Sequence, residues 1–211
     1  MEHLVLFAKT PRLNEVKTRL VPRLSAEEAL LLHEAMLADQ TRFLEALAGE
    51  GRACDVCLDA QQGEGDLGAR MHRALLRAFA QGAAAAAILG ADAPTLPQAL
   101  VDDAFALLAR GADAVVVPAH DGGYVLVGAS RPVPALFDRI PWGTSLVQAA
   151  TRRAAREAGL VLAETAPWWD VDVESDLHRL ARELSADPAR APRTASVLAR
   201  LGLYAPRNPM L

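Results

Sequence analysis

The chain carries a cluster of cations near its N-terminus. Four Lys and Arg side chains lie within eleven residues, namely Lys9, Arg12, Lys17 and Arg19, and the hydroxyl of Thr18 lies among them. A polyphosphate ligand needs positive charge together with directed hydrogen-bond donors, and this cluster supplies both. The segment lacks the glycines of a P-loop or a dinucleotide fingerprint, so a solvated charged loop is the alternative. We predict a phosphate cradle in this segment.

A single carboxylate follows an apolar run in the middle of the chain. Asp92 lies in the segment Gly90-Ala91-Asp92-Ala93-Pro94-Thr95, whose small residues allow a ligand to approach the backbone. A carboxylate in this position suits a divalent cation that bridges phosphate oxygens. The alternative is a turn into a helix with Thr95 as its N-cap, but capping leaves Asp92 without a role. We therefore predict that Asp92 is a metal ligand.

Two further segments combine acidic residues with small ones. In an extended backbone Asp170 and Asp172 point the same way, so one can face a site while another acid caps the helix that follows. Glu174 and Asp176 are explained more simply by the helix dipole. Asp121, followed by two glycines, could hold a sugar, a metal or a loop, and a plain hairpin turn is the alternative.

Strands and helices that alternate along the chain must position these segments. Short apolar runs predict strands at 4–8, 53–58, 85–89, 114–117, 124–127 and 160–163. Periodic patterns and start signals predict helices at 25–48, from Asp66 onward, and at 97–109, 145–158, 174–185 and 194–201. Ser25 with Glu28 three residues on predicts a capping box at the start of the first helix, and Asp66 caps the second. The predicted fold is a Rossmann-like three-layer α/β/α arrangement with a mostly parallel sheet, in which 124–127 returns antiparallel. Such sheets bind ligands at the carboxyl ends of their strands.

Composition limits the classes of protein that the chain can represent. With 211 residues, 52% of them hydrophobic, we expect one domain over 1–211, with a helical C-terminal tail from about 187. The net charge of −4 argues against a nucleic-acid partner, and no apolar run approaches the ~18 residues of a membrane span. Cys54 and Cys57 cannot form a disulfide framework, and we predict buried structural cysteines in a cytoplasmic protein.

Taken in order, several motifs resemble one bacterial family of nucleotide-diphospho-sugar transferase-like proteins, known as selenodomain-associated or arsenosugar-pathway glycosyltransferases. The motifs are Phe7-Ala8-Lys9, Val16-Lys17-Thr18-Arg19-Leu20, Gly65-Asp66-Leu67-Gly68, Arg70-Met71, Gly90-Ala91-Asp92-Ala93-Pro94, Pro118-Ala119, Asp121-Gly122-Gly123-Tyr124, Gly128, Ile140-Pro141-Trp142 and Asp170-Val171-Asp172. The resemblance covers about residues 2–180. Asn14 stands where the family usually has Gly, and Asn tolerates a left-handed backbone.

The resemblance implies a glycosyltransferase A-type fold, distantly similar to the guanylyltransferases of molybdenum-cofactor and 2-phospho-lactate metabolism. It implies a nucleotide at the carboxyl edge of the sheet and a divalent metal, Mg²⁺ or Mn²⁺, between its phosphates and the aspartates. The implied metal ligands are Asp92 and Asp172. The implied nucleotide and phosphate contacts are Lys9, Arg12, Lys17, Thr18, Arg19, Asp66 and Gly68. Gly122, Gly123 and Tyr124 would shape the sugar or acceptor side, and Lys17 and Asp121 are the candidate catalytic residues.

Three functions follow as hypotheses. The first is a metal-dependent transferase that takes the sugar of a nucleotide sugar to a small acceptor, because metal and cations would neutralise the departing diphosphate. The second is a guanylyltransferase-like nucleotidyltransferase, in which a small phosphorylated substrate attacks the α-phosphorus of a nucleoside triphosphate and pyrophosphate leaves; the small size of the chain favours it. The third is a non-catalytic nucleotide-binding protein, since fold does not determine function. A homodimer is compatible with all three.

Overall fold

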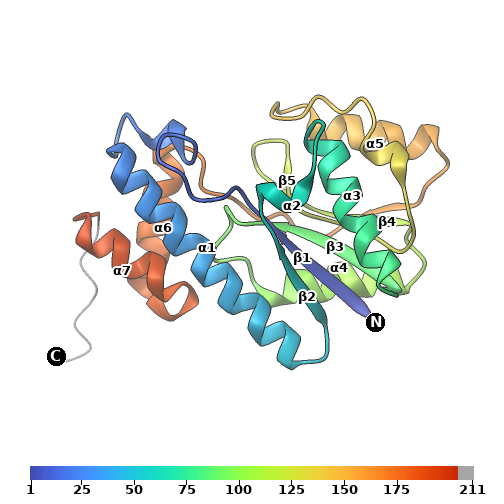
Figure 1. Ribbon diagram of the computed structural model, residues 1–211, viewed down its shortest axis with the longest axis horizontal. Coiled ribbons are helices and arrows are strands. Elements are labelled where there is room, and N and C mark those ends of the chain that lie inside the picture. The colour runs from blue at the N-terminus through green and yellow to red at the C-terminus, as the bar shows by residue number, and fades with distance from the viewer. Residues whose placement is uncertain (204–211) are drawn as a thin grey trace. The chain divides into compact units, whose positions relative to one another are not determined.

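The computed structural model describes residues 1–203 and contains one six-stranded sheet in the order β2-β1-β3-β5-β4-β6 (Figure 1). The strands are β1 (Glu2–Phe7), β2 (Ala53–Cys57), β3 (Ala85–Gly90), β4 (Ala114–Pro118), β5 (Tyr124–Ala129) and β6 (Leu162–Glu164). β5 runs antiparallel to both β3 and β4, and the remaining neighbours pair in parallel. The predicted mostly parallel sheet with an antiparallel return is confirmed.

Helices alternate with these strands. They are α1 (Ala26–Gly49), α2 (Asp59–Gln62), α3 (Leu67–Ala80), α4 (Gln98–Ala109), α5 (Val147–Glu157), α6 (Glu174–Ala186) and α7 (Pro192–Arg200). Short 3-10 turns lie at Thr18–Leu20, Pro134–Leu136 and Pro188–Arg190. Every predicted helix is present. The structure adds α2, whose four residues are too few to show a helical periodicity in the sequence.

The signals that start the helices are mostly those expected from the sequence. Ser25 and Glu28 form the predicted capping box, in which the Ser25 N–H donates to the Glu28 carboxylate (2.7 Å) and the Glu28 N–H donates to Ser25 Oγ (3.2 Å). Asp66 caps α3 by accepting the Ala69 N–H (2.8 Å). The alternative interpretation of Thr95 as an N-cap does not hold, because α4 starts after Pro97, whose restricted φ suits a helix start, and Thr95 is buried.

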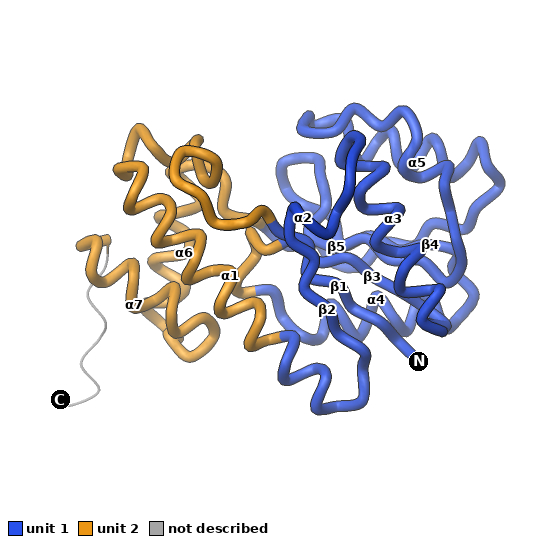
Figure 2. Tube along the Cα trace, viewed as in Figure 1, with its two compact units in different colours: residues 1–8, 44–90, 96–169 blue, residues 9–43, 91–95, 170–211 orange. Residues whose placement is uncertain are grey.

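One part of the chain, unit 1, consists of residues 1–8, 44–90 and 96–169 and holds the whole sheet (Figure 2). Alternate strand residues such as Val5, Ile88 and Val116 form an apolar core with α3 and α5 on one face. Helix α4 packs on β3, β4 and β5. Because both faces are covered, the strands can be apolar throughout, as the β4 sequence Ala-Val-Val-Val-Pro shows.

The other part, unit 2, consists of residues 9–43, 91–95 and 170 onward (Figure 2). It is built from most of α1 together with α6 and α7. The segment after Asp187 contains the Pro188–Arg190 turn and α7, and it packs through Ala191, Thr194 and Leu198, each fully buried. The prediction of one domain over 1–211 includes residues 204–211, which lie outside the described part of the chain.

Two smaller expectations concern membrane-spanning helices and the two cysteines. Within residues 1–203, no helix combines the length and hydropathy needed to cross a bilayer. Cys57 is buried, as predicted, whereas Cys54 is only half-buried, and both are free thiols. They lie three residues apart in β2, and an odd spacing places side chains on opposite faces of a strand.

Candidate functional site

The basic loop that follows β1 belongs to unit 2. Asn14 has a left-handed backbone (φ 63°), as its replacement of a family glycine predicts. The Lys9 ammonium donates to the Glu15 carbonyl (3.3 Å), and Arg12 pairs with the Glu15 carboxylate (3.5 Å). These contacts lie at the surface, so the Lys9 and Arg12 cations remain accessible to solvent.

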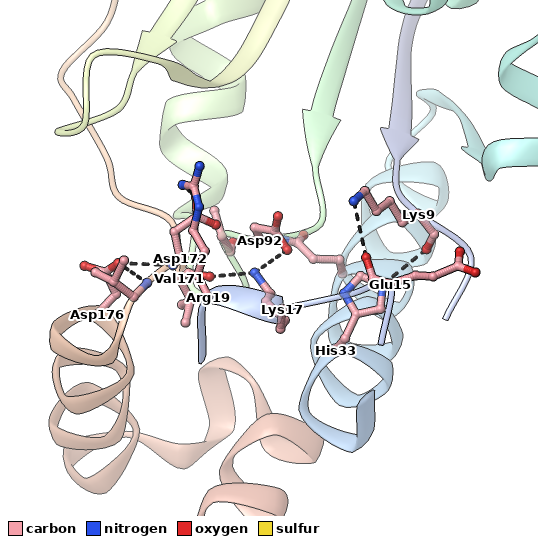
Figure 3. A network of polar contacts seen from close by, with 12 residues as sticks. Lys9, Glu15, Lys17, Arg19, His33, Asp92, Val171, Asp172 and Asp176 are labelled. Atoms are coloured by element: carbon pink, nitrogen blue, oxygen red, sulfur yellow. Dashed lines mark hydrogen bonds and ion pairs between the residues drawn. The ribbon is translucent and has the colours of Figure 1, made fainter. Parts of the chain in front are cut away.

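Lys17 differs from the other cations of this loop because its side chain is buried, with 4% of its surface exposed. Its backbone is left-handed (φ 49°, ψ 33°) at the entrance to the Thr18–Leu20 turn. The ammonium contacts Asp92 Oδ1 at 2.5 Å and donates to the Val171 carbonyl at 2.6 Å (Figure 3). Lys17 therefore joins three segments that are far apart in the sequence.

Asp92 points outward from a buried loop. Its neighbours Ala91 and Ala93 are almost fully buried, while the Asp92 side chain keeps 45% of its surface exposed. The Val171 N–H donates to the Asp92 carbonyl (2.9 Å). Loss of water around the carboxyl opposes its ionisation, but the charge and hydrogen bond of Lys17 outweigh this effect and lower the pKa of Asp92. Asp92 is thus an ionised carboxylate accessible to solvent.

The acidic segment 170–176 supplies further carboxylates. Val171 is fully buried, and oxygens of Asp170 and Asp172 lie within 4.8 Å of each other. Asp172 also pairs with Arg19 (3.2 Å). Asp176 accepts the N–H groups of Asp172 (3.1 Å) and Val173 (2.9 Å), and Figure 3 shows it beside Asp172. It lies in the first turn of α6, the position on which the simpler interpretation of this acid depends.

These carboxylates fit the ligand set of a hard divalent cation. Mg²⁺ and Mn²⁺ favour oxygen ligands, and Mg²⁺ usually binds through one or two carboxylates plus substrate phosphates. The backbone bond between Asp92 and Val171 places Asp92 beside the segment that carries Asp170 and Asp172. Because Mg–O distances are about 2.0–2.1 Å, two oxygens on opposite sides of one ion lie about 4 Å apart. This separation is comparable with the 4.8 Å limit between the oxygens of Asp170 and Asp172.

Three polar residues of this region were not predicted from the sequence. His33 on α1 is 4% exposed, and its Nε2 lies 3.2 Å from the Lys9 carbonyl. Burial, together with the charges of Lys17 and Lys9, lowers the pKa of His33 despite the opposing effects of that hydrogen bond and of Asp92. The other two are Gln40 and Arg190, which bind the loop of Asp92. The sequence pattern could have pointed to His33 and Gln40, because both are polar residues on the buried face of α1, where apolar residues are expected.

The remaining predicted site residues lie in unit 1, and several have structural roles there. Asp66 is the α3 cap, and Gly68 allows α3 to approach the Phe137 carbonyl and the Trp142 ring closely. Asp121 accepts the Gly123 N–H (2.8 Å). Gly122 has a φ of 93° and lies against the backbone of Ser145.

Tyr124 packs edge-on against Trp142, with 6.2 Å between ring centroids. In unit 2, Thr18 is exposed at the first position of its turn. The roles in nucleotide, sugar and acceptor binding assigned to these residues remain predictions.

Comparison with known proteins gives a family for the chain. Residues 25–144 match the family described as "Uncharacterized protein conserved in bacteria (DUF2064)". The match covers more than half of the sequence, so the chain belongs to this family. A search of curated proteins gives no match.

The solved structures that are similar to this chain include proteins from two bacteria. A protein from Desulfovibrio desulfuricans G20, provisionally named a nucleotide-diphospho-sugar transferase, is 28% identical with a TM-score of 0.81, and the match covers 96% of each chain. This similarity confirms the resemblance and the fold class predicted from the motifs. A cytidylyltransferase from Leptospira borgpetersenii serovar Hardjo-bovis (strain JB197) has 11% identity and a TM-score of 0.44 over 100% of this chain and 98% of the other, which is too distant to inform function.

Proposed function

We propose that this member of the DUF2064 family is a metal-dependent transferase that binds a nucleotide-activated sugar and passes the sugar to a small acceptor. The observation that carries the proposal is the meeting of Lys17, Asp92 and the 170–172 segment, which combines buried cationic charge with accessible carboxylates. The D. desulfuricans protein, similar over nearly its whole length, supports the same class of reaction.

In this proposal the chain divides the work between cations and carboxylates. Asp92 and Asp172 hold the divalent metal, Mg²⁺ or Mn²⁺, and Asp170 lies close enough to Asp172 to assist. The bound metal supplies charge neutralisation for the diphosphate that departs from the sugar. Lys17 keeps Asp92 ionised, and its proposed part in catalysis is to add positive charge beside that carboxylate.

The phosphate contacts are proposed for the exposed cations of the same loop. Lys9, Arg12 and Arg19 reach solvent and carry no more than surface contacts, which a phosphate can replace at little cost. Thr18 adds a hydroxyl donor at the exposed start of its turn. Asp121 is proposed as a second catalytic residue, and Gly122, Gly123 and Tyr124 as the sugar or acceptor contacts.

A panel of nucleotide sugars, each incubated with Mn²⁺, with Mg²⁺ or with EDTA, tests the proposal through release of the nucleoside diphosphate. We expect release with at least one donor, dependent on the metal. Asp92→Asn and Asp172→Asn should each lower kcat/KM at least tenfold, whereas Asp103→Asn, which changes an exposed carboxylate of α4, should leave it unchanged. Folding of each variant is checked by circular dichroism.

Two results would replace the proposal with one of its rivals. Release of pyrophosphate from a nucleoside triphosphate, without turnover of any nucleotide sugar, would assign nucleotidyl transfer. Nucleotide binding that is independent of metal and unaffected by either aspartate variant would leave only a non-catalytic binding protein.

A further inference from the structure

The loop that carries Asp92 is held by its backbone carbonyls. Residues 91 and 93–96 are all buried, so Asp92 is the single residue of this stretch with substantial exposure. The loop itself has little polar side-chain chemistry to hold it, because Ala91, Ala93 and Pro94 cannot form side-chain hydrogen bonds. Groups from other segments therefore determine where the Asp92 carboxylate lies.

Gln40 provides the first of these groups. It lies on α1 with 1% of its surface exposed, and its Nε2 donates to the Ala93 carbonyl. A buried amide at a helix position that would suit a hydrophobic residue costs stability unless it is hydrogen-bonded, and here its partner is the residue next to Asp92.

Arg190 provides the second. It ends the Pro188–Arg190 turn, and its Nη2 donates to the Thr95 carbonyl at 2.6 Å. Its Nη1 binds the Glu183 carboxylate of α6, which orients the guanidinium toward the loop. Together with the Val171 N–H on the Asp92 carbonyl, three donors from three segments bind the carbonyls of residues 92, 93 and 95.

We infer that Gln40 and Arg190 are positioning residues that hold Asp92 in the geometry needed for metal binding. The inference rests on the proposed role of Asp92 as a metal ligand. A metal ligand must be held to within about 0.5 Å of its productive place, and neighbours that orient ligands typically contribute 10–100-fold in metal affinity or activity. The C-terminal segment that carries Arg190 is thus a support of the site.

The test compares Gln40→Leu with wild type in two measurements. Calorimetric titration with Mn²⁺ alone gives the dissociation constant, and hydrogen exchange gives the protection of the Val171 amide, whose partner is the Asp92 carbonyl. Leu has a similar volume but no donor. We expect about tenfold weaker Mn²⁺ binding and faster exchange at Val171.

Leu47→Ala is the matched control. Leu47 is a fully buried residue of the same helix, so its truncation lowers stability by about 2–5 kcal/mol without removing a donor to the loop. It should leave both the Mn²⁺ affinity and the exchange of the Val171 amide close to wild type at a temperature where the variant stays folded. Equal loss of Mn²⁺ affinity in both variants would show a merely structural role and overturn the inference.

Arg190 offers a second variant if Gln40→Leu does not fold. Arg190→Met should speed exchange of the Val171 amide and weaken Mn²⁺ binding, whereas Arg193→Met, which changes an exposed arginine of the same segment, should do neither. Unchanged exchange and affinity in Arg190→Met would contradict the inference. If wild type itself binds no Mn²⁺, the proposed metal dependence fails, and exchange at Val171 alone then decides whether these residues position the loop.

Discussion

Lys17 and Asp92 form an unequal pair, because the ammonium is buried and the carboxylate is half exposed. Asp92→Asn would leave an unpaired charge in the interior, whereas Lys17→Met would leave a carboxylate that water can reach. We expect Asp92→Asn to cost about 3 kcal/mol and Lys17→Met about 1–2 kcal/mol. Urea unfolding measures both.

Arg19→Met provides the reference stability loss against which Asp92→Asn and Lys17→Met are compared. Arg19 pairs with Asp172 at the surface, where such a bridge contributes about 1 kcal/mol or less. A larger loss for Lys17→Met than for Asp92→Asn would mean that the ammonium is less isolated from water than the structure indicates.

His33 is a single residue that should affect how the stability of the protein depends on pH. Its pKa lies below the ordinary value of 6.5, so the unfolded chain takes up the proton first as the pH falls. Stability should therefore decrease as the pH drops below about 6.5, and His33→Gln should reduce that slope. Part of the pH dependence should remain in His33→Gln, because burial also lowers the pKa of His72. Urea unfolding at pH 7.5 and pH 5.5 gives the difference.

An unchanged pH dependence in His33→Gln would contradict this prediction. If His33→Gln and wild type lose the same free energy of unfolding between the two pH values, His33 is accessible to protons in the folded state.

Asp92 contributes to the pH dependence of stability at lower pH. A carboxyl whose pKa is depressed loses its stabilising effect as the pH falls below its ordinary value of 3.8.

Among the secondary-structure elements, α3 depends most clearly on one residue. A Cβ on Gly68 would lie 2.4 Å from the Phe137 carbonyl oxygen and 2.6 Å from Trp142 Nε1. Gly68→Ala should therefore destabilise the protein by about 2–3 kcal/mol, because the backbone of a neighbouring segment would have to move. Thermal unfolding measures the loss.

Gly49→Ala is the control at the end of α1, where a Cβ meets nothing within 4 Å. It should change stability by less than about 1 kcal/mol. A small effect of Gly68→Ala accompanied by weaker nucleotide binding would favour the predicted ligand role of Gly68 over its packing role.

For the whole molecule, ligand binding should appear as stabilisation. A ligand at about 100 times its dissociation constant stabilises the folded state by about 2.7 kcal/mol, which in a chain of this size raises Tm by about 5–10 °C. A thermal-shift screen of nucleotides and nucleotide sugars, with and without Mn²⁺, should show a shift that needs both components and disappears in Asp172→Asn. A shift that is as large with EDTA as with Mn²⁺ would argue against a shared site for metal and phosphate.

Much of the fold was accessible from local patterns. The strand at β1 and the capping box of α1 were predicted correctly because an apolar run and a reciprocal pair of cap hydrogen bonds each act within a few residues. The alternative interpretation of Thr95 as an N-cap fails, although Ser and Thr favour that position in general, because here Pro97 starts the helix and the Thr95 side chain is buried.

The sequence alone determined which residue types could do chemistry, because charge and hydrogen-bonding capacity belong to each side chain wherever it lies. Only the tertiary structure decided their partners. Lys17 meets Asp92 and Val171, and Gln40 meets Ala93, across separations that no sequence period encodes. Burial then sets the chemistry: the same kind of cation is a surface charge at Arg12 and a buried partner at Lys17, since only folding removes water from one and leaves it around the other.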